Sequence, residues 1–426
     1  MWQARDMVAP YAMREIEITA PLEPIILAPG EGGVHLLVRH EGRPVGRLLL
    51  PRRWIGPGIP VRKLRRLAAS ASRRLLETRM LYDALLEGTR REQPPTPSLT
   101  VAVCTRNRAT LLRRCLAALV AMRDARLIRD REDDPEASPI EILVVDNAPS
   151  DEQTRQAVTD FPGVRYVTEP VPGLDFARNR ALAETGRDYL GFVDDDAVVD
   201  AGWLDQLAEG IEASPQAGAF TGPVLPLMLE TEAQLRFEHA GGFGEGLDWA
   251  IYDAREWGST THPAGAGRMG TGASMAFSVA ALRAIGGFDE ALDTGPPLPG
   301  GGDIDGYYRI VRAGYRIVYL PGLLVHHEHR RDLPGLRKQY HSWGLAAMAL
   351  LRKNREVDPA TRPQHASLLR WYARRNARRL ARALLGRGPL HPGMVLAEIW
   401  GAAQGYFGEY QRSQRRVAER KRIHQA

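Results

Sequence analysis

The sequence predicts an α/β fold, in which a mostly parallel sheet is flanked by helices on both faces. Between residues 98 and 330, short apolar runs of strand length alternate with stretches of helical periodicity. This alternation is typical of parallel strands joined by crossover helices. The chain has 426 residues, 44% of them hydrophobic, which is enough for two or three domains with ordinary cores.

Composition divides the chain into three regions. Residues 1–97 form a small β-rich domain that ends in a helix and a Pro-rich linker. Residues 98–330 form the α/β domain, and residues 331–426 form a helical, basic C-terminal region. We expect the chemistry to lie in the α/β domain, because only that part places polar clusters at the ends of apolar runs.

The N-terminal domain begins with short β-like runs at Ile16–Thr19 and Ile25–Leu27. Val34–Arg39 and Pro44–Leu50 flank a turn and predict a hairpin. Leucines and small residues then recur every three or four positions over Leu64–Leu85, which predicts a helix.

Strands of the α/β domain are predicted at five apolar runs, namely Leu99–Cys104, Glu141–Val145, Val164–Val167, Tyr189–Val193 and Tyr315–Leu320. Helices are predicted around Leu111–Leu119, Thr154–Val158, Phe176–Glu184 and Asp303–Ala313. The charged segment Asp124–Pro139 is expected to be a loop.

The cysteine content and the N-terminal sequence favour a cytoplasmic protein. Cys104 and Cys115 lie in apolar segments and are expected to be reduced thiols. Charged residues interrupt the first 18 positions, so a secretory signal is not expected, and no apolar run has the length of a membrane span.

The charge of the chain is uneven. The net charge is +6, but residues 331–426 carry 20 Lys and Arg against six Asp and Glu. Such a region can contact an anionic membrane surface, nucleic acid or an anionic acceptor, or it can be the solvated face of helices. We favour peripheral contact at the inner face of a membrane over nucleic acid.

Three consecutive carboxylates, Asp194, Asp195 and Asp196, follow directly after the predicted strand Tyr189–Val193. Ligands of open α/β sheets bind beyond the carboxyl ends of the strands. Clustered carboxylates repel one another, and Mg²⁺ or Mn²⁺ relieves this repulsion and binds phosphate oxygens. Taken alone, the three residues are more typical of a charged turn.

Two other strands deliver polar residues to the same edge, which are Thr105, Arg106, Asn107 and Arg108 after the first strand and Asp146 and Asn147 after the second. An arginine there can pair with a diphosphate, and Asp146 can accept from a base or ribose. Singly, each is more typical of a cap or turn; jointly they favour a nucleotide site. No Gly-rich phosphate loop follows the first strand, which makes a metal the natural partner of the phosphates.

Further candidates lie in the second half of the α/β domain. Arg178, near a helix start, can hold the donor or pair with surface carboxylates. Asp303 follows three glycines at a helix N-terminus and fits either a plain cap or an ionised general base. Three histidines within Val325–Arg330 suit either a metal or a polar joint between domains.

The acceptor side is less well marked. The segment from Gly222 to Arg268 is expected to lie over the acceptor, because it carries aromatic residues among glycines, although buried aromatics are an equal alternative. The candidate acceptor contacts are Trp249, Trp257 and Asp305.

The motifs in this order resemble those of the family 2 glycosyltransferases of the GT-A fold. The resemblance covers residues 98 to 330 and rests on Val101–Arg108, Val144–Asn147, Gly173–Asn179, Val193–Asp196, Met275–Phe277, Gly286–Asp289, Gly302–Asp305 and His327. Each motif is weak alone, but the order and spacing of the set are specific.

The resemblance implies an inverting enzyme that moves a sugar from a nucleotide-diphosphate sugar to an acceptor hydroxyl. It implies that Asp194 and Asp196 form a DxD metal site that His327 completes, and that Asp303 is the catalytic base. The donor side would comprise Thr105, Arg106, Asn107, Arg108, Asp146, Asn147, Arg178, Asp194 and Asp195. The family commonly has Glu-Asp where this chain has Gly302-Asp303, and this departure bears on the acceptor side and on the base.

Three alternatives remain open at the level of the sequence. A sugar nucleotidyltransferase would share the sheet and the acidic site, but it usually carries a Gly-rich loop where this chain has Thr105 to Arg108. A catalytically degenerate protein that binds nucleotide sugars would explain Gly302. A basic protein that binds RNA or membranes would explain the C-terminal region.

Overall fold

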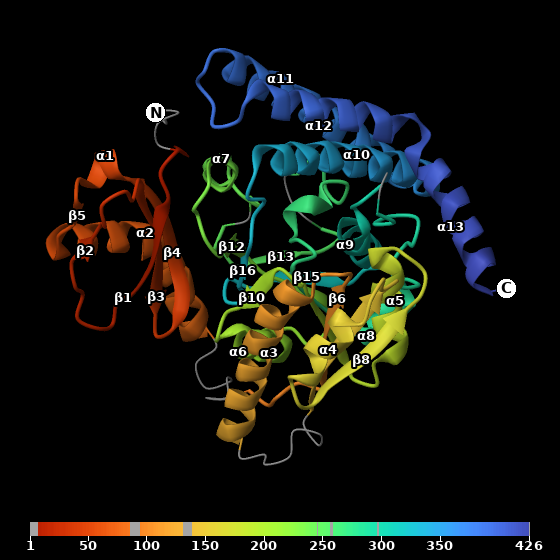
Figure 1. Ribbon diagram of the computed structural model, residues 1–426, viewed down its shortest axis with the longest axis horizontal. Coiled ribbons are helices and arrows are strands. Elements are labelled where there is room, and N and C mark those ends of the chain that lie inside the picture. The colour runs from red at the N-terminus through yellow and green to blue at the C-terminus, as the bar shows by residue number, and fades with distance from the viewer. Residues whose placement is uncertain are drawn as a thin grey trace.

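A computed structural model of the chain describes residues 7–85, 94–130, 139–244, 246–255, 259–295 and 298–425, with the backbone alone for residues 79–85 and 425. The N-terminal strands lie at one side of the molecule (Figure 1). A large sheet with its helices fills the centre, and the last long helices lie across the top and right of the view.

The central sheet has eight strands in the order β13-β15-β11-β14-β9-β6-β7-β8. The strands β9, β6, β7 and β8 run parallel, and β14 runs antiparallel between β9 and β11. In sheet order the bounds are Ala250–Tyr252, Arg316–Tyr319, Ala217–Thr221, Ser274–Ser278, Tyr189–Val193, Leu99–Thr105, Ile140–Asn147 and Val164–Glu169. The predicted α/β fold with a mostly parallel sheet is confirmed.

Apolar residues on both sides of the strands explain why helices cover both faces. On β6, Val101 and Val103 pack with α3, α4 and α6, whereas Ala102 packs with α5, α8 and α9. The first group spans Ala109–Asp130, Gln153–Thr159 and Trp203–Ala213, and the second spans Leu174–Glu184, Val279–Ala284 and Gly302–Arg312. Successive side chains of a strand point to opposite faces, so an apolar run is buried from both sides.

The helix α3 continues seven residues into the segment that we expected to be a loop. The prediction is wrong for residues 124–130, because the charges there have partners. Arg126 is buried and donates to Asp130 at 2.8 Å, to Asp205 at 2.8 Å and to the carbonyl of Pro94 at 2.6 Å. Residues 131–138 lie outside the described part of the chain.

The N-terminal domain contains a sheet of β1 (Tyr11–Glu17), β3 (Gly33–His40) and β4 (Arg43–Pro51), with β3 in the middle. The predicted hairpin is confirmed, and its turn has positive φ at Glu41 and Gly42, as tight two-residue turns require. The strand expected at Ile16–Thr19 is displaced. It begins at Tyr11, which is buried and donates its N–H to the carbonyl of Leu229 at 2.8 Å.

The remaining elements of this domain are short, apart from one helix. The strands β2 (Ile25–Ile26) and β5 (Gly58–Ile59) form a second small sheet, and α1 covers Arg52–Ile55. The helix α2 runs over Val61–Leu85 and confirms the helix that the leucine spacing predicts.

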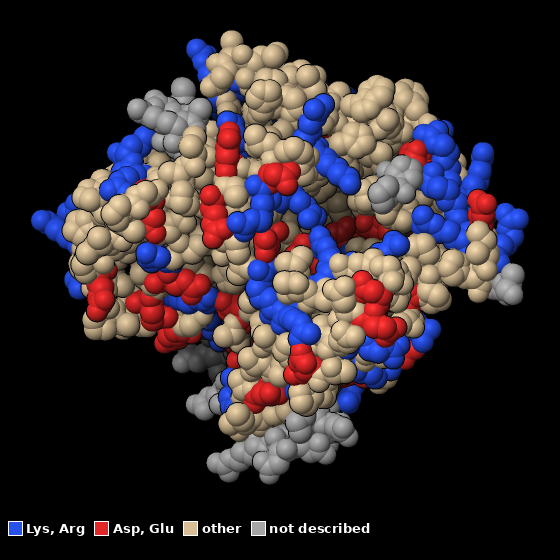
Figure 2. All heavy atoms as spheres, in the orientation of Figure 1, with Lys and Arg blue, Asp and Glu red and all other residues tan. Residues whose placement is uncertain are grey.

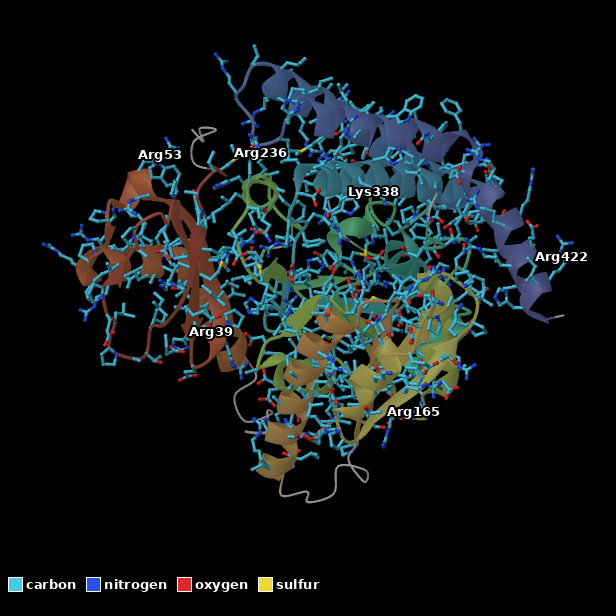
Figure 3. The ribbon with its side chains drawn as sticks, viewed as in Figure 1. Arg39, Arg53, Arg165, Arg236, Lys338 and Arg422 are labelled. Carbon is cyan, nitrogen blue, oxygen red and sulfur yellow. The ribbon has the colours of Figure 1, made fainter. Side chains whose placement is uncertain are left out.

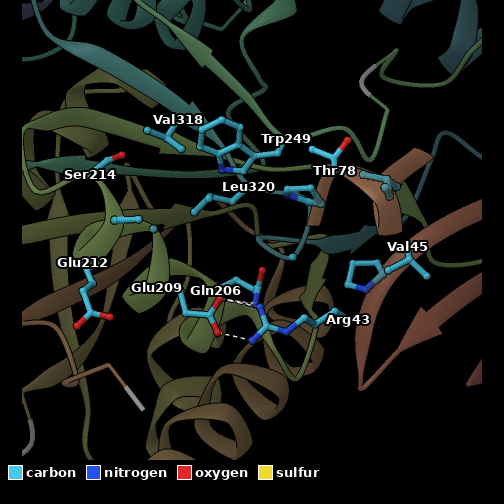
Figure 4. Close-up of a pocket in the computed structure, with 16 residues that line it drawn as sticks. Arg43, Val45, Thr78, Gln206, Glu209, Glu212, Ser214, Trp249, Val318 and Leu320 are labelled. Atoms are coloured by element: carbon cyan, nitrogen blue, oxygen red, sulfur yellow. Dashed lines mark hydrogen bonds and ion pairs between the residues drawn. The ribbon is translucent and has the colours of Figure 1, made fainter. Parts of the chain in front are cut away.

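Three arginines of the β3–β4 hairpin dock the N-terminal domain on the α/β domain. Arg39 pairs with Asp200, Arg43 with Glu209, and Arg47 with Glu238. Arg39 lies on the side of the hairpin that faces the central sheet (Figure 3). A cavity of about 370 Å³ lies between the two domains next to the pair of Arg43 and Glu209 (Figure 4).

The C-terminal region consists of helices, as predicted. They are α10 (Leu333–Val357), a short 3-10 helix (Pro359–Thr361), α11 (Arg362–Leu384), α12 (Pro392–Gln404), a π-helical segment (Gly405–Glu409) and α13 (Tyr410–Gln425). Gly344, Gly401 and Gly405 let α10 and α12 approach so closely that a Cβ at each would collide with a backbone carbonyl. Within the described residues, none of the helices has the length and hydropathy of a membrane-spanning segment.

Candidate active site

The carboxyl ends of β6, β7 and β9 bring the predicted polar residues to one edge of the sheet. Thr105 on β6 lies opposite Asp146 on β7, and Asp194 follows Val193, the last residue of β9. Acidic side chains occupy the bottom of a hollow below α10, with Lys and Arg around its rim (Figure 2). The predicted convergence of these strand ends is confirmed.

His327 joins Asp194 and Asp196 because of a second, smaller sheet. The strand β10 (Ala197–Val199) begins directly after Asp196 and pairs antiparallel with β16 (Val325–His327), which places Ala197 opposite His327. His327 Nε2 lies 3.0 Å from Asp196 Oδ1. One ligand atom from each of Asp194, Asp196 and His327 lies within 4.8 Å of the others, and this donor set fits a divalent cation such as Mn²⁺.

The electrostatics of this triad also fit a cation. Burial and the neighbouring Asp196 raise the pKa of Asp194 to about 6. Burial has the same tendency at Asp196, but His327 and Arg108 outweigh it and lower the pKa of that carboxyl. The pKa of His327 is raised, because Asp196 and Asp194 outweigh the effect of burial. Two carboxylates that repel each other in a buried site are relieved by a positive ion.

A chain of buried polar groups continues from the triad to the N-terminal domain. His327 Nδ1 lies 3.3 Å from His329 Nδ1, and His329 Nε2 lies 3.0 Å from Glu238 Oε1. Arg47 from the hairpin lies 3.6 Å from the other oxygen of Glu238. When His327 Nε2 is free of a proton, as a metal ligand must be, its proton is on Nδ1 and faces His329. Glu238 then holds the tautomer of His329 that can accept it.

The carboxylate of Asp195 is engaged by the loop after β6. The Thr105 hydroxyl donates to Asp195 Oδ2 at 2.7 Å, and Arg108 donates to Asp195 Oδ1 at 2.6 Å. Arg108 also reaches Asp196 Oδ2 at 3.2 Å. Asp195 therefore holds the end of β6 and the loop that follows it against the segment that carries Asp194 and Asp196.

Asp146 offers a buried acceptor at the end of β7. The Tyr166 hydroxyl donates to Asp146 Oδ2 at 2.9 Å and the Thr154 side chain also interacts with this carboxylate, whereas Oδ1 lacks a well-formed hydrogen bond within the described ranges. Burial raises the pKa of Asp146. A buried acceptor without a donor is costly unless a ligand supplies one.

Asn107 and Asn147 hold the loops around this acceptor. Asn107 adopts a positive φ of 54°, which asparagine tolerates, and its side-chain oxygen accepts from the N–H of Ser150 at 3.1 Å. Asn147 donates to the carbonyl of Val171 at 2.7 Å and accepts from the N–H of Gly173 at 2.8 Å. Both side chains thus join loops at the sheet edge.

Positive charge gathers where α13 reaches this edge. Arg106 is exposed, and Arg420 on α13 donates to the carbonyls of Pro172 and Thr294 at 2.7 and 2.9 Å. Burial and the neighbouring Arg416 and Arg106 lower the pKa of Arg420. An anionic group bound here would relieve the repulsion among these arginines.

Arg178 lies within a buried cluster of carboxylates rather than at the surface. It donates to Asp175 Oδ1 at 2.9 Å and to Asp293 Oδ2 at 3.2 Å. Its pKa is raised, because Asp175, Asp293, Asp303 and Asp194 outweigh its burial. We expected Arg178 either to hold the donor or to pair with surface carboxylates. It pairs with carboxylates, and these carboxylates are buried.

This cluster explains the departure at Gly302. A Cβ on residue 302 would collide with the carboxylate of Asp175, and the N–H of Gly302 donates to Asp293 Oδ2 at 2.9 Å. Burial and Asp293 raise the pKa of Asp175 well above its usual range. The carboxylate of Asp175 therefore lies where a side chain at position 302 would be, and Asp293 accepts from the backbone of the same residue.

Asp303 lies in the first turn of α9, next to the loop that leads into β14. Its Oδ2 accepts from the N–H of Gly272 at 2.7 Å, and its Oδ1 accepts from Ile304 at 2.8 Å. Gly272 precedes β14, whose Ser274 lies opposite Val193. This pairing places the loop that contacts Asp303 beside the segment that carries Asp194.

The three candidate acceptor residues are not brought together. Asp305 is fully buried and pairs with Lys353 and Arg309 at 2.7 Å each. Trp249 lines the cavity between the domains, together with Arg43, Gln206 and Leu320 (Figure 4). Trp257 lies outside the described part of the chain.

A group of aromatic side chains beside His327 was not predicted from the sequence. It consists of Phe237, Phe243 and Trp343, and we call it the aromatic wall. Phe243 lies 5.3 Å from His327 between ring centroids, and Trp343 on α10 lies 6.0 Å from Phe243 and is 37% exposed. Phe237 adjoins both His329 and Trp343. The signal for His329 was available, since strand alternation places residues 327 and 329 on the same side of an extended chain. No sequence pattern indicated that Trp343 would lie beside His327.

Two family models match the chain. The model described as Glycosyl transferase family 2 matches residues 100–270, and the model described as Glycosyl transferase family group 2 matches residues 190–400. The two spans overlap and together include Thr105, Asp194, Asp303 and His327. These matches and the site point to the same family of proteins. The chain belongs to glycosyltransferase family 2, as the motifs predict.

Sequence relatives lie in the same class. The pre-mycofactocin glycosyltransferases of two strains of Mycobacterium tuberculosis are each 28% identical to this chain over 283 residues. The match covers 64% of this chain and 52% of the relative. The chain thus spans about half the length of these curated relatives.

Solved structures also resemble the chain. The mannosyltransferase PcManGT of Pyrobaculum calidifontis, in complex with GDP-Man and Mn²⁺, is 18% identical with a TM-score of 0.46, over 77% of this chain and 94% of the other. TarS 1-349 of S. aureus, in complex with UDP-GlcNAc, is 15% identical with a TM-score of 0.38, over 59% of this chain and 66% of the other.

Proposed function

We propose that this glycosyltransferase is metal-dependent and inverting, and moves a sugar from a nucleotide-diphosphate sugar to an acceptor hydroxyl. The observation that carries the proposal is the triad of Asp194, Asp196 and His327 at the sheet edge where Thr105 and Asp146 also lie. A divalent cation held there, Mn²⁺ or Mg²⁺, would neutralise the charge that develops on the departing diphosphate.

The donor is held by the strand ends and their loops. The free oxygen of Asp146 accepts from an N–H of the base or a ribose hydroxyl, which satisfies its missing bond. Arg106 and the arginines of α13 attract the diphosphate. Thr105, Asn107, Arg108, Asn147 and Asp195 shape this site through the bonds that fix its loops. Arg178 does so through its ion pairs with Asp175 and Asp293.

Asp303 is the base. It takes the proton from the acceptor hydroxyl as that oxygen attacks the anomeric carbon, and the bond to the diphosphate breaks in the same displacement. The N–H groups of Gly272 and Ile304 hold its carboxylate in place at the start of α9. The reaction therefore proceeds in one displacement without a covalent intermediate, and the anomeric configuration inverts.

The acceptor approaches between α9 and the aromatic wall. Trp343 is the partly exposed aromatic residue beside His327, and an aromatic face suits the apolar face of a sugar ring. Asp305 is committed to Lys353 and Arg309, which leaves it a structural role. The acceptor class stays open between glycan, lipid-linked and small-molecule hydroxyls.

The test is a stereochemical assay. The purified protein is incubated with nucleotide sugars and Mn²⁺ or Mg²⁺, and the anomeric configuration of the first product, including the sugar released to water, is followed by NMR. We expect release that requires metal and has inverted configuration. Pyrophosphate release would favour a nucleotidyltransferase, retained configuration would contradict the role of Asp303, and no reaction with any donor would favour a degenerate binding protein.

A further inference from the structure

Exposed large apolar side chains gather in the C-terminal region. Of the seventeen that are exposed among the described residues, eleven lie after residue 331. Seven of these lie on α11, α12 and the segments that follow each, and we call them the outer helical face. They are Trp371, Leu384, Leu385, Leu396, Ile399, Trp400 and Phe407. Such a concentration marks an interaction surface rather than ordinary exposure.

The geometry of α12 directs these side chains outward. Leu396, Ile399 and Trp400 are spaced three and four residues apart and share one side of the helix, while Gly401 packs on α10. Phe407 is 74% exposed, because the backbone leaves the helical conformation at Phe407 and Gly408. In Figure 1, α10 lies between α12 and the sheet, which puts α11 and α12 outermost.

Basic residues accompany this apolar face. Arg370, Arg374, Arg378 and Arg382 follow one another at four-residue intervals on α11 and are exposed. From Arg362 to His424 the chain has fourteen Lys and Arg but only three Asp and Glu.

Two of those three acids point inward. Glu398 is buried and pairs with Arg375 and Arg379. Glu409 is buried and pairs with Arg412 and Arg416. Nearly all the exposed charges of these helices are therefore positive.

A basic pocket lies beside Phe407. Its volume is about 580 Å³, and Arg352, Arg412 and Arg415 line it together with Phe407 and Gln411. Arg352 pairs with Glu356 and Arg412 with Glu409, whereas Arg415 adds a further guanidinium group next to the exposed aromatic side chain. This arrangement suits a phosphate group at the boundary of an apolar phase.

We propose that the outer helical face docks on an anionic lipid bilayer. Its apolar side chains enter the boundary between headgroups and acyl chains, the α11 arginines meet lipid phosphates, and the pocket at Phe407 holds one of them. Nucleic acid would use the arginines but leave Leu384, Leu385 and Leu396 in water. A second copy of the chain would bring two cationic faces together. The proposal goes beyond glycosyl transfer and does not depend on it.

The test is flotation of the full chain with vesicles of phosphatidylcholine, with and without phosphatidylglycerol. We expect binding only with the anionic lipid. Trp400→Ser with Phe407→Ser should weaken it roughly 100-fold or more, because two aromatic side chains no longer insert. Arg374→Gln, Arg378→Gln and Arg382→Gln together should weaken it on the order of 100-fold. The control is Ile26→Ser with Trp54→Ser, two exposed residues of the N-terminal domain, which should bind as wild type.

Several outcomes would overturn the proposal. They are equal flotation with and without anionic lipid, equal loss in the control variant, a wild-type dimer that Trp400→Ser with Phe407→Ser dissociates in sedimentation, and binding to RNA without binding to vesicles. A thermal shift by nucleotide sugars that is unchanged in the Trp400→Ser, Phe407→Ser variant keeps the donor site and the docking face separate.

Discussion

At the scale of single residues, Asp303 carries the chemistry that we propose. Its carboxylate accepts two backbone N–H groups, one of them from Gly272 in the loop beside the segment that carries Asp194. Asp303→Asn keeps the shape but removes the base, so turnover should fall about 10²–10⁴-fold, while donor binding by calorimetry should persist.

The matched control for this variant is Asp332→Asn. Asp332 also accepts a backbone N–H at the start of a helix, from Gly335 at 2.6 Å, but lies outside the proposed site. It should keep its turnover, because asparagine caps a helix as well as aspartate. Full activity of Asp303→Asn, or an equal loss in both variants, would remove Asp303 from the mechanism.

Asp194 gives the metal site a pH dependence. Its pKa is raised to about 6, and a metal ligand must be ionised, so binding strengthens as the pH rises through about 6. Below that value, Mn²⁺ affinity should fall about tenfold per pH unit, since one proton is displaced per ion bound. The proton on His327, whose pKa is also raised, adds to this fall. Titration calorimetry across this range measures it, and a flat affinity would contradict the site.

At the scale of elements, β16 supplies the metal ligand His327, and α7 (Glu232–His239) supplies Glu238, which supports that ligand through His329. Glu238→Met removes the acceptor of His329 and hence the group that holds the proton of His327 in place. Mn²⁺ affinity should fall about 10–100-fold, as is usual for partners of metal-binding histidines. Glu238→Gln keeps an acceptor oxygen and should lie between Met and wild type.

Glu209→Met is the control for that comparison. Glu209 also pairs with a hairpin arginine, Arg43, but it lies on α6 and lines the cavity between the domains. Its variant should lose docking stability without losing Mn²⁺ affinity. An equal fall of affinity in both variants would show that hairpin docking, rather than the histidine chain, supports the metal site.

The tie between α9 and α10 is a second property of elements. Lys353 on α10 is buried and pairs with Asp305 at 2.7 Å and with Asp289 at 2.6 Å. Lys353→Met leaves Asp305 buried without that cation, which should lower the free energy of unfolding by about 3–5 kcal/mol. Lys338→Met, an exposed position on the same helix, should change it by less than about 0.5 kcal/mol in the same denaturant titration. Similar values for the two variants would contradict the structural role of Asp305.

The strands β6, β7 and β9 and the residues after them were predictable, because apolar runs that end in polar clusters have a direct physical meaning. The end of α3 was not, since Arg126 and Asp130 look like loop residues until Asp205 and Pro94 supply their partners. Short strands such as β10 and β16 have three residues each and no periodicity to detect. Their pairing nevertheless brings His327 to Asp196.

Other features of the site depend on contacts that no sequence pattern reveals. Gly302 lacks a side chain because Asp175, 127 positions earlier in the sequence, occupies the space. Trp249 was expected near the acceptor because of its neighbours in sequence, and it lines a different cavity. Trp343 takes a place beside His327 only because α10 crosses the site.

At the scale of the whole molecule, the central sheet supplies the donor edge, and the other two parts support it from outside. The N-terminal hairpin reaches the metal site through Arg47 and Glu238, and α13 reaches the donor edge through Arg420. The first contact supports the histidine pair at the metal site, and the second holds the loops that contain Pro172 and Thr294. The central claim for the molecule is therefore that donor binding requires the metal triad.

The most direct measurement is a thermal-shift screen against UDP-, dTDP- and GDP-sugars, each with and without Mn²⁺ or Mg²⁺. A ligand at 100 times its Kd stabilises the native state by about 2.7 kcal/mol, which is readily visible. We predict a shift for one nucleotide class that requires metal and disappears in Asp196→Asn. A shift of equal size without metal or in Asp196→Asn, or no shift with any donor, would contradict the account.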